Sequence, residues 1–404
     1  MDVIRLKYAC HLIMGQSPNF ESINFADNGM PFLQGKADFG LISPKPTVWC
    51  SESKKVAVKD DILLSVRAPV GSVNICDQDY IIGRGLCAIR PFKLVNDYCW
   101  YLFQTISDKL LSRSTGTTYD AVSISDIANI VIPIPDRDTQ IIISSYLDHR
   151  IVNIDKLLAD LQSQAEMLDR YKRELITEAV THGIMKNVRH KNSGIDWIGK
   201  VPSHWKITKT KWIFEIAKRL YDKEDRDVLS ITQRGLKIKD IGSNDGQLAE
   251  SYIGYQIVNV NDFAMNSMDL LTGWVDCSAF EGVTSPDYRV FRFHQSKPQC
   301  HNYYKYLFQM CYKNRIFYRL GQGVSNLGRW RLQADQFLNM KLPQPPIEEQ
   351  EKIAEYLGNK TSQIESLIAD INQQIEKLKQ YRQIVIHDAV TGKIKIKEEP
   401  NDGN

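Results

Sequence analysis

The sequence predicts an α+β protein with two mostly-β globular domains separated by two long helices that pack as an antiparallel coiled coil. Three observations predict this fold and its pseudo-two-fold internal repeat. One stretch of the chain occurs twice, each copy carries a long heptad pattern, and short strand patterns separated by turns fill the segments between the copies.

The duplicated stretch runs from Asn129 to Ile184 and again from Asn339 to Ile394. The copies align without a gap at a constant offset of 210 residues, and about a third of the aligned positions are identical. The first copy opens NIVIPIPDRDTQ and ends ITEAVTHGI, whereas the second opens NMKLPQPPIEEQ and ends IHDAVTGKI. A gapless match of this length indicates an internal duplication.

Each copy predicts a helix that starts just after its prolines. Proline lacks an N–H and restricts the preceding residue to extended geometry, so the Pro-x-Pro segment itself is not helical. Beyond it, apolar residues alternate in steps of three and four, as in a heptad seam. A helix of ~40 residues is about 60 Å long and cannot bury such a stripe alone. We therefore expect the two duplicates to pack against each other.

The segment before the first helix, to about residue 128, predicts short strands and one helix. Residues 62–76 form two strands around a Pro-Val-Gly turn, and residues 80–91 form another strand. A helical pattern then places Tyr98, Leu102, Ile106 and Leu110 on one face, before a Gly/Ser/Thr-rich loop. These elements predict a compact α+β domain with a mostly β core.

The second globular segment echoes the first only in part. A polar connector, THGIMKNVRHKNSGIDWIGKVPSHW, leads into it. KTKWIF resembles the early RLKYA, and the helix around KYLFQMCYKNRIFYRLG has a counterpart in the first domain. In contrast, VLSITQRGLKIKD and MNSMDLLTGWVDC have no convincing counterpart in the first half. The alternation of duplicated helices and diverged domains suggests one architectural role and two separate recognition roles.

Composition excludes several classes of protein. The chain has 404 residues, 43% hydrophobic content and a formal net charge of +3. No apolar run approaches the length of a membrane span, and the N-terminus lacks the pattern of a signal peptide. The eight cysteines show no CxxC pairing, which predicts reduced thiols in a cytoplasmic protein.

The sequence shows no catalytic motif. Phosphate-binding GxxxxGK[ST], dinucleotide-binding GxGxxG and HExxH patterns are missing from the sequence, as is an NPP-aromatic motif. The PDRD and PDY segments at Pro135 and Pro286 lack a following acidic-x-Lys pair, so we interpret them as turns. His182 and His387 fall near helix ends, where a cation is favoured. We therefore predict no catalytic residue and no metal site in this chain.

The repeated strand-PxPxxxxQ-helix unit, IVIPIPDRDTQ and MKLPQPPIEEQ with Tyr-Leu following each, resembles the specificity subunit of type I restriction-modification systems. DILLSVRAPVG, SGIDWIGKVPSHW and GRWRL are also similar to sequences of that family, and the resemblance covers essentially the whole chain. It implies target recognition domains at 1–138 and 185–348, the latter including the connector. It also implies conserved spacer helices at 139–184 and 349–394 and a polar tail at 395–404. The helices would carry partner-binding coiled-coil positions at Leu147, Ile154, Leu161, Leu168, Leu357, Ile364, Ile371 and Leu378.

DNA-reading residues need hydrogen-bond donors on loops rather than in the core. Arg can grip guanine or phosphate, and Gln can pair with adenine. For each candidate residue, the alternative interpretation is a solvated surface side chain or a side chain in a buried structural hydrogen bond. We single out Ser65, Arg67, Thr117, Thr118 and Tyr119 in the first domain, and Gln233, Arg234, Lys237, Thr272, Ser325, Arg329 and Arg331 in the second. Trp274 and Trp330 are expected to stack within the core rather than on a base.

The favoured interpretation is a non-catalytic DNA-recognition subunit of a type I restriction-modification complex. It would read a bipartite target in double-stranded DNA and direct methyltransferase and restriction subunits to it. S-adenosylmethionine, ATP and Mg are expected in those partner subunits and no cofactor in this chain. The alternative is a non-catalytic coiled-coil scaffold whose globular domains bind protein partners. The absence of catalytic motifs does not discriminate between the two.

Overall fold

The computed structural model describes residues 2–26, 28–52, 55–106, 110, 121–223, 225–240, 249, 251–294, 298–323, 330–394 and 396. The chain divides into two compact units. The first combines Met1–Gln162 with Asn372–Asn404, and the second spans Ser163–Ile371. Each unit therefore contains one globular part and half of each long helix. The predicted α+β fold class, with two sheet-rich parts and two long helices, is confirmed.

The two long helices are α4, Arg137–His182, and α8, Ile347–Val390. Prolines precede both, as predicted, and Asp136 accepts hydrogen bonds from the amide and hydroxyl of Thr139 at the start of α4. Gly183 and Gly392 adopt positive φ values of 79° and 71° just after the helices. This left-handed conformation ends a helix at low cost only for glycine.

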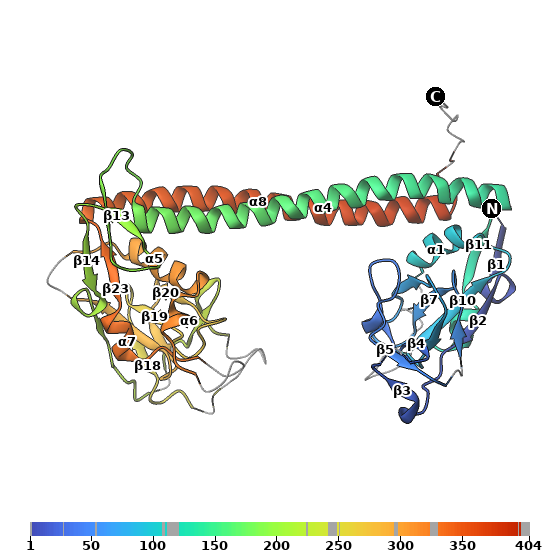
Figure 1. Ribbon diagram of the computed structural model, residues 1–404, viewed down its shortest axis with the longest axis horizontal. Helices are drawn as coiled ribbons and strands as arrows, with labels where there is room; N and C mark the ends of the chain where they lie inside the picture. The colour runs from blue at the N-terminus through green and yellow to red at the C-terminus, as the bar shows by residue number, and fades with distance from the viewer. Residues whose placement is uncertain are drawn as a thin grey trace. The chain divides into compact units, whose positions relative to one another are not determined.

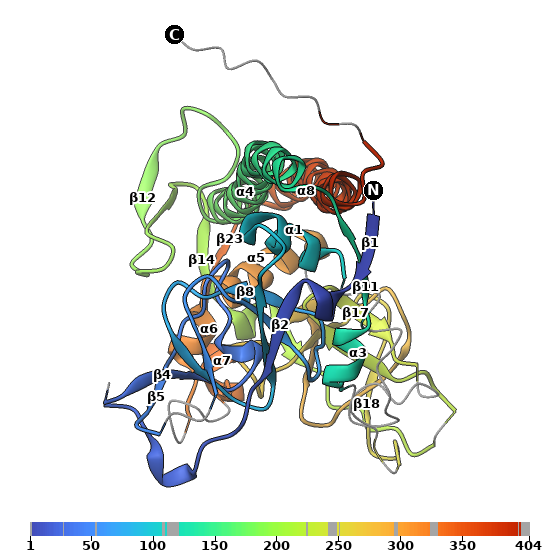
Figure 2. The same cartoon turned by 90° about the vertical axis from the view of Figure 1, so that its right-hand side faces the viewer.

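Opposite ends of the two helices pack together within each unit (Figures 1 and 2). In the first unit, residues 137–162 lie against 372–390, where Arg382 forms an ion pair with Asp155 at 2.8 Å. In the second unit, residues 163–182 lie against 347–371, where Lys172 pairs with Glu365 at 3.4 Å. Because each unit joins the first half of one helix to the last half of the other, the helices run antiparallel, as the heptad pattern predicts.

The globular part of the first unit is built on two antiparallel sheets and a mixed one. A four-stranded sheet has the order β2 (Cys10–Met14), β10 (Leu86–Pro91), β7 (Ile62–Ser65) and β8 (Val73–Ile75). A mixed five-stranded sheet contains β3 (Ile23–Asn24), β5 (Val48–Cys50), β4 (Met30–Leu33), β9 (Tyr80–Ile82) and β6 (Val56–Ala57), and β1 (Asp2–Arg5) pairs with β11 (Val131–Ile134). The described α-helices of this part are α1, Asn96–Gln104, and α3, Ile124–Ala128. Short 3-10 turns occupy η1 (Leu6–Tyr8), η2 (Phe20–Ser22) and η3 (Lys36–Asp38).

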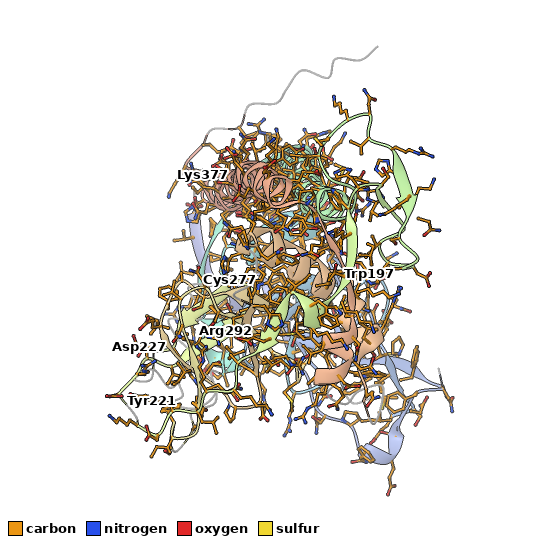
Figure 3. All side chains as sticks on the ribbon, turned by 90° about the vertical axis from the view of Figure 1, so that its left-hand side faces the viewer. Trp197, Tyr221, Asp227, Cys277, Arg292 and Lys377 are labelled. Atoms are coloured by element: carbon orange, nitrogen blue, oxygen red, sulfur yellow. The ribbon has the colours of Figure 1, made fainter. Side chains whose placement is uncertain are left out.

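The second unit repeats the four-stranded sheet and replaces the five-stranded one. Its four-stranded sheet has the order β15 (Phe214–Ile216), β22 (Arg289–Phe293), β19 (Phe263–Met265) and β20 (Val275–Cys277), and β14 (Lys206–Lys209) pairs with β23 (Lys341–Gln344). The described residues of this unit also form the strand pairs β16 (Leu229–Thr232) with β17 (Gly235–Ile238), β18 (Gln256–Val258) with β21 (Gly282–Thr284), and β12 (His190–Asn192) with β13 (Lys200–Pro202). The helices are α5 (His301–Lys313), α6 (Ile316–Leu320) and α7 (Ala334–Asn339), with η4 at Thr210–Trp212. Figure 3 shows Cys277 and Arg292 on strands of the four-stranded sheet.

Three details differ from the sequence prediction. Residues 80–91 form two strands in different sheets, because the chain turns at Gly83 and Gly85, where a Cβ would meet residues 32–35. MNSMDLLTGWVDC does have a counterpart, since β19 and β20 enclose a turn just as β7 and β8 do. The polar connector contains the β12–β13 hairpin and ends at Trp205, which is fully buried and donates its indole N–H to Glu349 at 2.8 Å.

Each globular part shares its main hydrophobic core with the helix pair. In the first unit, Tyr98 and Leu102 of α1 pack with Leu147 of α4 and Ile386 of α8. In the second, Tyr303 and Leu307 of α5 pack with Leu357 and Val180. Full burial of a large apolar side chain contributes about 1.5–3 kcal/mol, so this shared core fixes each sheet to its own end of the helix pair.

Candidate nucleic-acid interface

The PxPxxxxQ motif anchors each globular part to a long helix. The Gln140 side chain is 2% exposed, accepts a hydrogen bond from the Val95 amide at 2.7 Å and donates one to the Pro135 carbonyl at 2.9 Å. Gln350 repeats both contacts, with the Cys300 amide at 3.0 Å and the Pro345 carbonyl at 2.9 Å. An amide side chain donates through its nitrogen and accepts through its oxygen, so a single glutamine satisfies both backbone groups. The motif thus fixes the first turn of α1 or α5 against the start of the long helix.

The predicted coiled-coil positions lie on the packed face of the helices. Leu147, Ile154, Leu161, Leu357 and Ile364 are buried, whereas Leu168, Ile371 and Leu378 are half-buried. Other apolar residues of the same helices face solvent. The exposed set includes Val152, Leu157, Met167, Tyr171, Leu367 and Ile384.

The turn between β7 and β8 carries two of the predicted DNA-reading residues. The Arg67 side chain is exposed. Ser65, in contrast, is 1% exposed; its hydroxyl donates to the Pro69 carbonyl at 2.8 Å and accepts from the Ser72 amide at 2.9 Å. This burial contradicts the exposed position that a DNA contact requires, so we assign Ser65 to the turn itself. Thr117, Thr118 and Tyr119 lie outside the described residues.

The β16–β17 hairpin presents Gln233, Arg234 and Lys237, all exposed. Gln233 donates to the Thr272 carbonyl at 3.3 Å, and the Thr272 hydroxyl donates to Asp269. Gln233 and Arg234 also line a pocket of about 400 Å³ together with residues of α4, α5 and α8. Besides these two, the pocket is lined by Asp169, Lys172, Arg173, Ile176, Gly235, Trp274, Asp276, Lys305, Tyr306, Gln309, Met310, Lys313, Asn314, Thr361 and Glu365.

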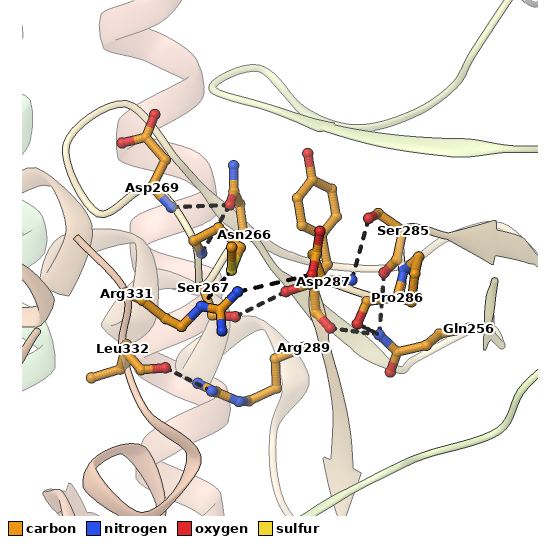
Figure 4. Close-up of polar contacts among 12 residues, drawn as sticks. Gln256, Asn266, Ser267, Asp269, Ser285, Pro286, Asp287, Arg289, Arg331 and Leu332 are labelled. Carbon is orange, nitrogen blue, oxygen red and sulfur yellow. Dashed lines mark hydrogen bonds and ion pairs between the residues drawn. The ribbon is translucent and has the colours of Figure 1, made fainter. Parts of the chain in front are cut away.

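Arg331 lies beside the β19–β20 turn, while Ser325 and Arg329 fall outside the described residues. The Arg331 guanidinium contacts the Met268 sulfur at 2.7 Å and lies 3.9 Å from a carboxylate oxygen of Asp287 (Figure 4). The nearby Arg289 donates to the Leu332 carbonyl at 2.8 Å, and its Nη1 has no partner among the described residues. Burial lowers the pKa of Arg289 to about 10.

Arg289 was missed by sequence reasoning. It opens the strand RVFRF and shares a strand face with Phe291 and Phe293, so a charged side chain in line with two phenylalanines was the available signal. The predicted positions of Trp274 and Trp330 agree with the structure. Trp274 is 7% exposed with Lys313 over its ring, and the Trp330 ring packs on Tyr318 with centroids 4.7 Å apart.

The structure thus defines a class of protein in which two differing globular parts are anchored by the same contacts to a duplicated helix pair. The model of the type I restriction modification DNA specificity domain matches residues 1–167 and 202–377. The chain therefore belongs to this family.

Three similar proteins illustrate the match. The chain is 37% identical over 172 residues to a specificity subunit assigned to the type I restriction enzyme MjaX of Methanocaldococcus jannaschii, an alignment covering 42% of this chain and 40% of that protein. It is 23% identical over 319 residues to the MjaVIII specificity subunit of the same organism, covering 76% and 72%. The crystal structure of an HsdS subunit from Thermoanaerobacter tengcongensis matches with a TM-score of 0.48 at 15% identity, covering 97% of each chain.

The residues that the structure describes were also compared with the requirements of a membrane span and of a metal site. None of the described helices is both long enough and apolar enough to cross a membrane. The same residues contain no group of three or more His, Cys, Asp and Glu side chains that could hold a metal ion. All eight cysteines are free thiols, as predicted.

Proposed function

We propose that this chain is the DNA sequence-recognition subunit of a type I restriction-modification complex. Each globular part reads one half of a bipartite target in double-stranded DNA. The observation that carries the proposal is the matching pair of anchors, Gln140 and Gln350, in a chain whose two globular parts differ in their outer strands. Two globular parts that differ in their outer strands but are anchored in the same way suit a protein that recognises two different DNA half-sites from one helix pair.

The differences between the two parts lie where readers are expected to differ. The four-stranded sheet has the same strand order in both units, with β10 equivalent to β22 and β7 to β19. The outer strands differ, since a five-stranded sheet in the first unit is replaced by separate pairs in the second. Base recognition depends on side chains at the groove, so a constant core with variable outer segments allows the two half-sites to differ.

The exposed apolar residues of α4 and α8 support a docking role for the helix pair. Val152 is 66% exposed and Met167 is 57% exposed, although the opposite face of α4 is already buried against α8. Exposed apolar side chains along a packed helix pair are expected where further helices dock. We propose that methyltransferase subunits bind there, that restriction subunits join that assembly, and that the partners supply S-adenosylmethionine, ATP and Mg.

A domain exchange tests the proposal. The full chain is assembled with its methyltransferase subunits, and its methylation sites are identified by sequencing. Replacing residues 1–128 with the equivalent domain of a relative should change one half of the methylated sequence and leave the other half unchanged. The reciprocal exchange, between the connector and β23, should change only the other half. If either exchange changed both halves together, two independent readers would be excluded.

The scaffold alternative makes a different prediction. A coiled-coil scaffold whose globular parts bind proteins would assemble with its partners, but the sites methylated would not depend on the globular parts. Assembly that survives both exchanges, with an unchanged methylation pattern, would favour the scaffold.

A further inference from the structure

The turns β7–β8 and β19–β20 are built on the same backbone frame. The Ser65 amide donates to the Ser72 carbonyl at 2.8 Å, and the equivalent Asn266 amide donates to the Trp274 carbonyl at 2.9 Å. The backbone carbonyl of the next residue in each turn then accepts a hydrogen bond from an amide that is distant in the sequence. Val122 N–H donates to the Val66 carbonyl at 3.0 Å, and Leu332 N–H donates to the Ser267 carbonyl at 3.0 Å.

These matching hydrogen bonds fix which residues are equivalent. Arg67 follows Val66 as Met268 follows Ser267, so Arg67 and Met268 occupy the same place. Ala121 precedes Val122 as Arg331 precedes Leu332, so Ala121 and Arg331 are also equivalent. The sequence duplication supports the second assignment, because these two residues differ by the same 210 positions as Asn129 and Asn339.

In both units the two positions face each other, and one of the two is arginine. Arg67 forms a β-bridge with Ala121 in the first unit. In the second, Arg331 reaches across to Met268, with 2.7 Å between Nε and the sulfur. The guanidinium thus comes from the turn in the first unit and from the facing segment in the second. Direct sequence comparison conceals this exchange, because neither arginine aligns with an arginine.

Both guanidinium groups remain available to an anion. The Arg67 side chain is exposed and has no polar partner among the described residues. The Arg331 side chain is 47% exposed, and its Nε contacts the Met268 sulfur. Its ion pair among the described residues is with Asp287, at 3.9 Å, and Asp287 is itself 66% exposed (Figure 4). Such a long exposed pair contributes little and opens readily. The half-buried Arg289 adds a second positive charge beside Arg331 and has no carboxylate within ion-pair distance among the described residues.

We propose that Arg67 and Arg331 make the same contact in the two half-sites and that the group each binds is a DNA phosphate. This inference rests on the proposed function and adds the residues and the chemical class of the contact. The two globular parts differ in their outer segments. A guanidinium that both parts place beside the equivalent turn is therefore expected to make a contact that is independent of base sequence. A guanidinium binds a phosphate through two parallel hydrogen bonds, which suits that role.

Salt-dependent DNA binding by the complex of the full chain with its methyltransferase subunits tests the inference. Two duplexes are used, one carrying the methylated sequence and one with both half-sites scrambled. Arg67→Ala and Arg331→Ala should each weaken binding to both duplexes equally, by about 5- to 10-fold. Each should also reduce the slope of log K against log salt by about 0.9. Arg189→Ala, at an exposed connector residue, is the matched control and should change neither quantity.

Transposed variants test the equivalence. Arg67→Met with Ala121→Arg gives the first unit the arrangement of the second, and Met268→Arg with Arg331→Ala does the reverse. Both double variants should recover the affinity and salt slope lost in the single variants. Failure of recovery, an unchanged salt slope in the single variants, or selective loss of binding to the methylated sequence would each overturn the inference. If the unaltered complex showed no preference for a bipartite sequence, the proposed function itself would fail, and this inference with it.

Discussion

The phenol of Tyr98 donates a 3.0 Å hydrogen bond to the carbonyl oxygen of Val390, 292 residues further along the chain. Tyr303 donates the equivalent bond, also 3.0 Å, to Val180. The two acceptors lie in the last turns of α8 and α4, where carbonyl groups lack partners within the helix. Each globular part therefore holds the start of the helix that follows it, through Gln140 or Gln350, and the end of the other helix. This crossed pattern requires the duplicated helices to run antiparallel.

Tyr98→Phe and Tyr303→Phe should each lower the free energy of unfolding by about 1–2 kcal/mol, because a buried carbonyl loses its donor while the ring packing is kept. Urea denaturation of the full chain measures the change. Tyr171→Phe, at an exposed tyrosine of α4, is the control and should have no measurable effect. Equal stability of all three variants would show that these hydrogen bonds contribute nothing to anchoring.

Gln140→Ala and Gln350→Ala should be more costly, with a loss of about 2–3 kcal/mol each, because each change removes the partner of a half-buried amide and of a buried carbonyl. Gln164→Ala, at an exposed position of α4, controls for loss of the side chain alone. Hydrogen exchange at the amides of Val95 and Cys300 locates the effect. Exchange should accelerate at Val95 only in the Gln140 variant and at Cys300 only in the Gln350 variant, and the opposite pattern would refute the local anchor.

Lengthening the helix pair should alter the spacing between half-sites without altering either half. A four-residue insertion after Ala159 adds about one helical turn, or ~6 Å, to α4. A matched insertion between Lys377 and Leu378 lengthens α8 on the opposing segment, which keeps the packing of Leu158 and Leu378 within the first unit. Sequencing of methylation sites reads the outcome. Under the two-reader proposal, changed half-sites at unchanged spacing would show that the helices do not set the distance.

His301 should make the second unit sensitive to acid. Burial lowers the pKa of its imidazole, which packs on Phe293 with ring centroids 4.7 Å apart. The unfolded chain then binds more protons than the folded chain below about pH 6.5, so stability falls as pH decreases from that value through the folded-state pKa.

Thermal unfolding measured across this range should show a smaller loss for His301→Gln than for the unaltered chain. His149→Gln, at an exposed histidine of α4, should behave like the unaltered chain. An identical pH dependence for His301→Gln would mean that the imidazole titrates alike in the folded and unfolded states.

The sequence alone determined the α+β class, the duplicated helices and their antiparallel pairing. These features follow from local rules, since prolines stop helices and a heptad stripe such as Leu147 to Leu161 needs a partner stripe. The repeated PxPxxxxQ unit also indicated the restriction-modification family. Exposed donors such as Arg67 and Arg331 could be named from loop chemistry, but not their relationship to each other.

Tertiary structure decided what those residues do. Ser65 and Arg67 are two positions apart in one motif, yet one is buried in the turn and the other is exposed. The role of Gln140 depends on the Val95 amide, 45 residues earlier. The equivalence of Arg67 with Met268, and of Ala121 with Arg331, depends on hydrogen bonds between segments far apart in the sequence. Sequence patterns report local periodicity and polarity, whereas the partner of a polar group is set by how distant segments pack.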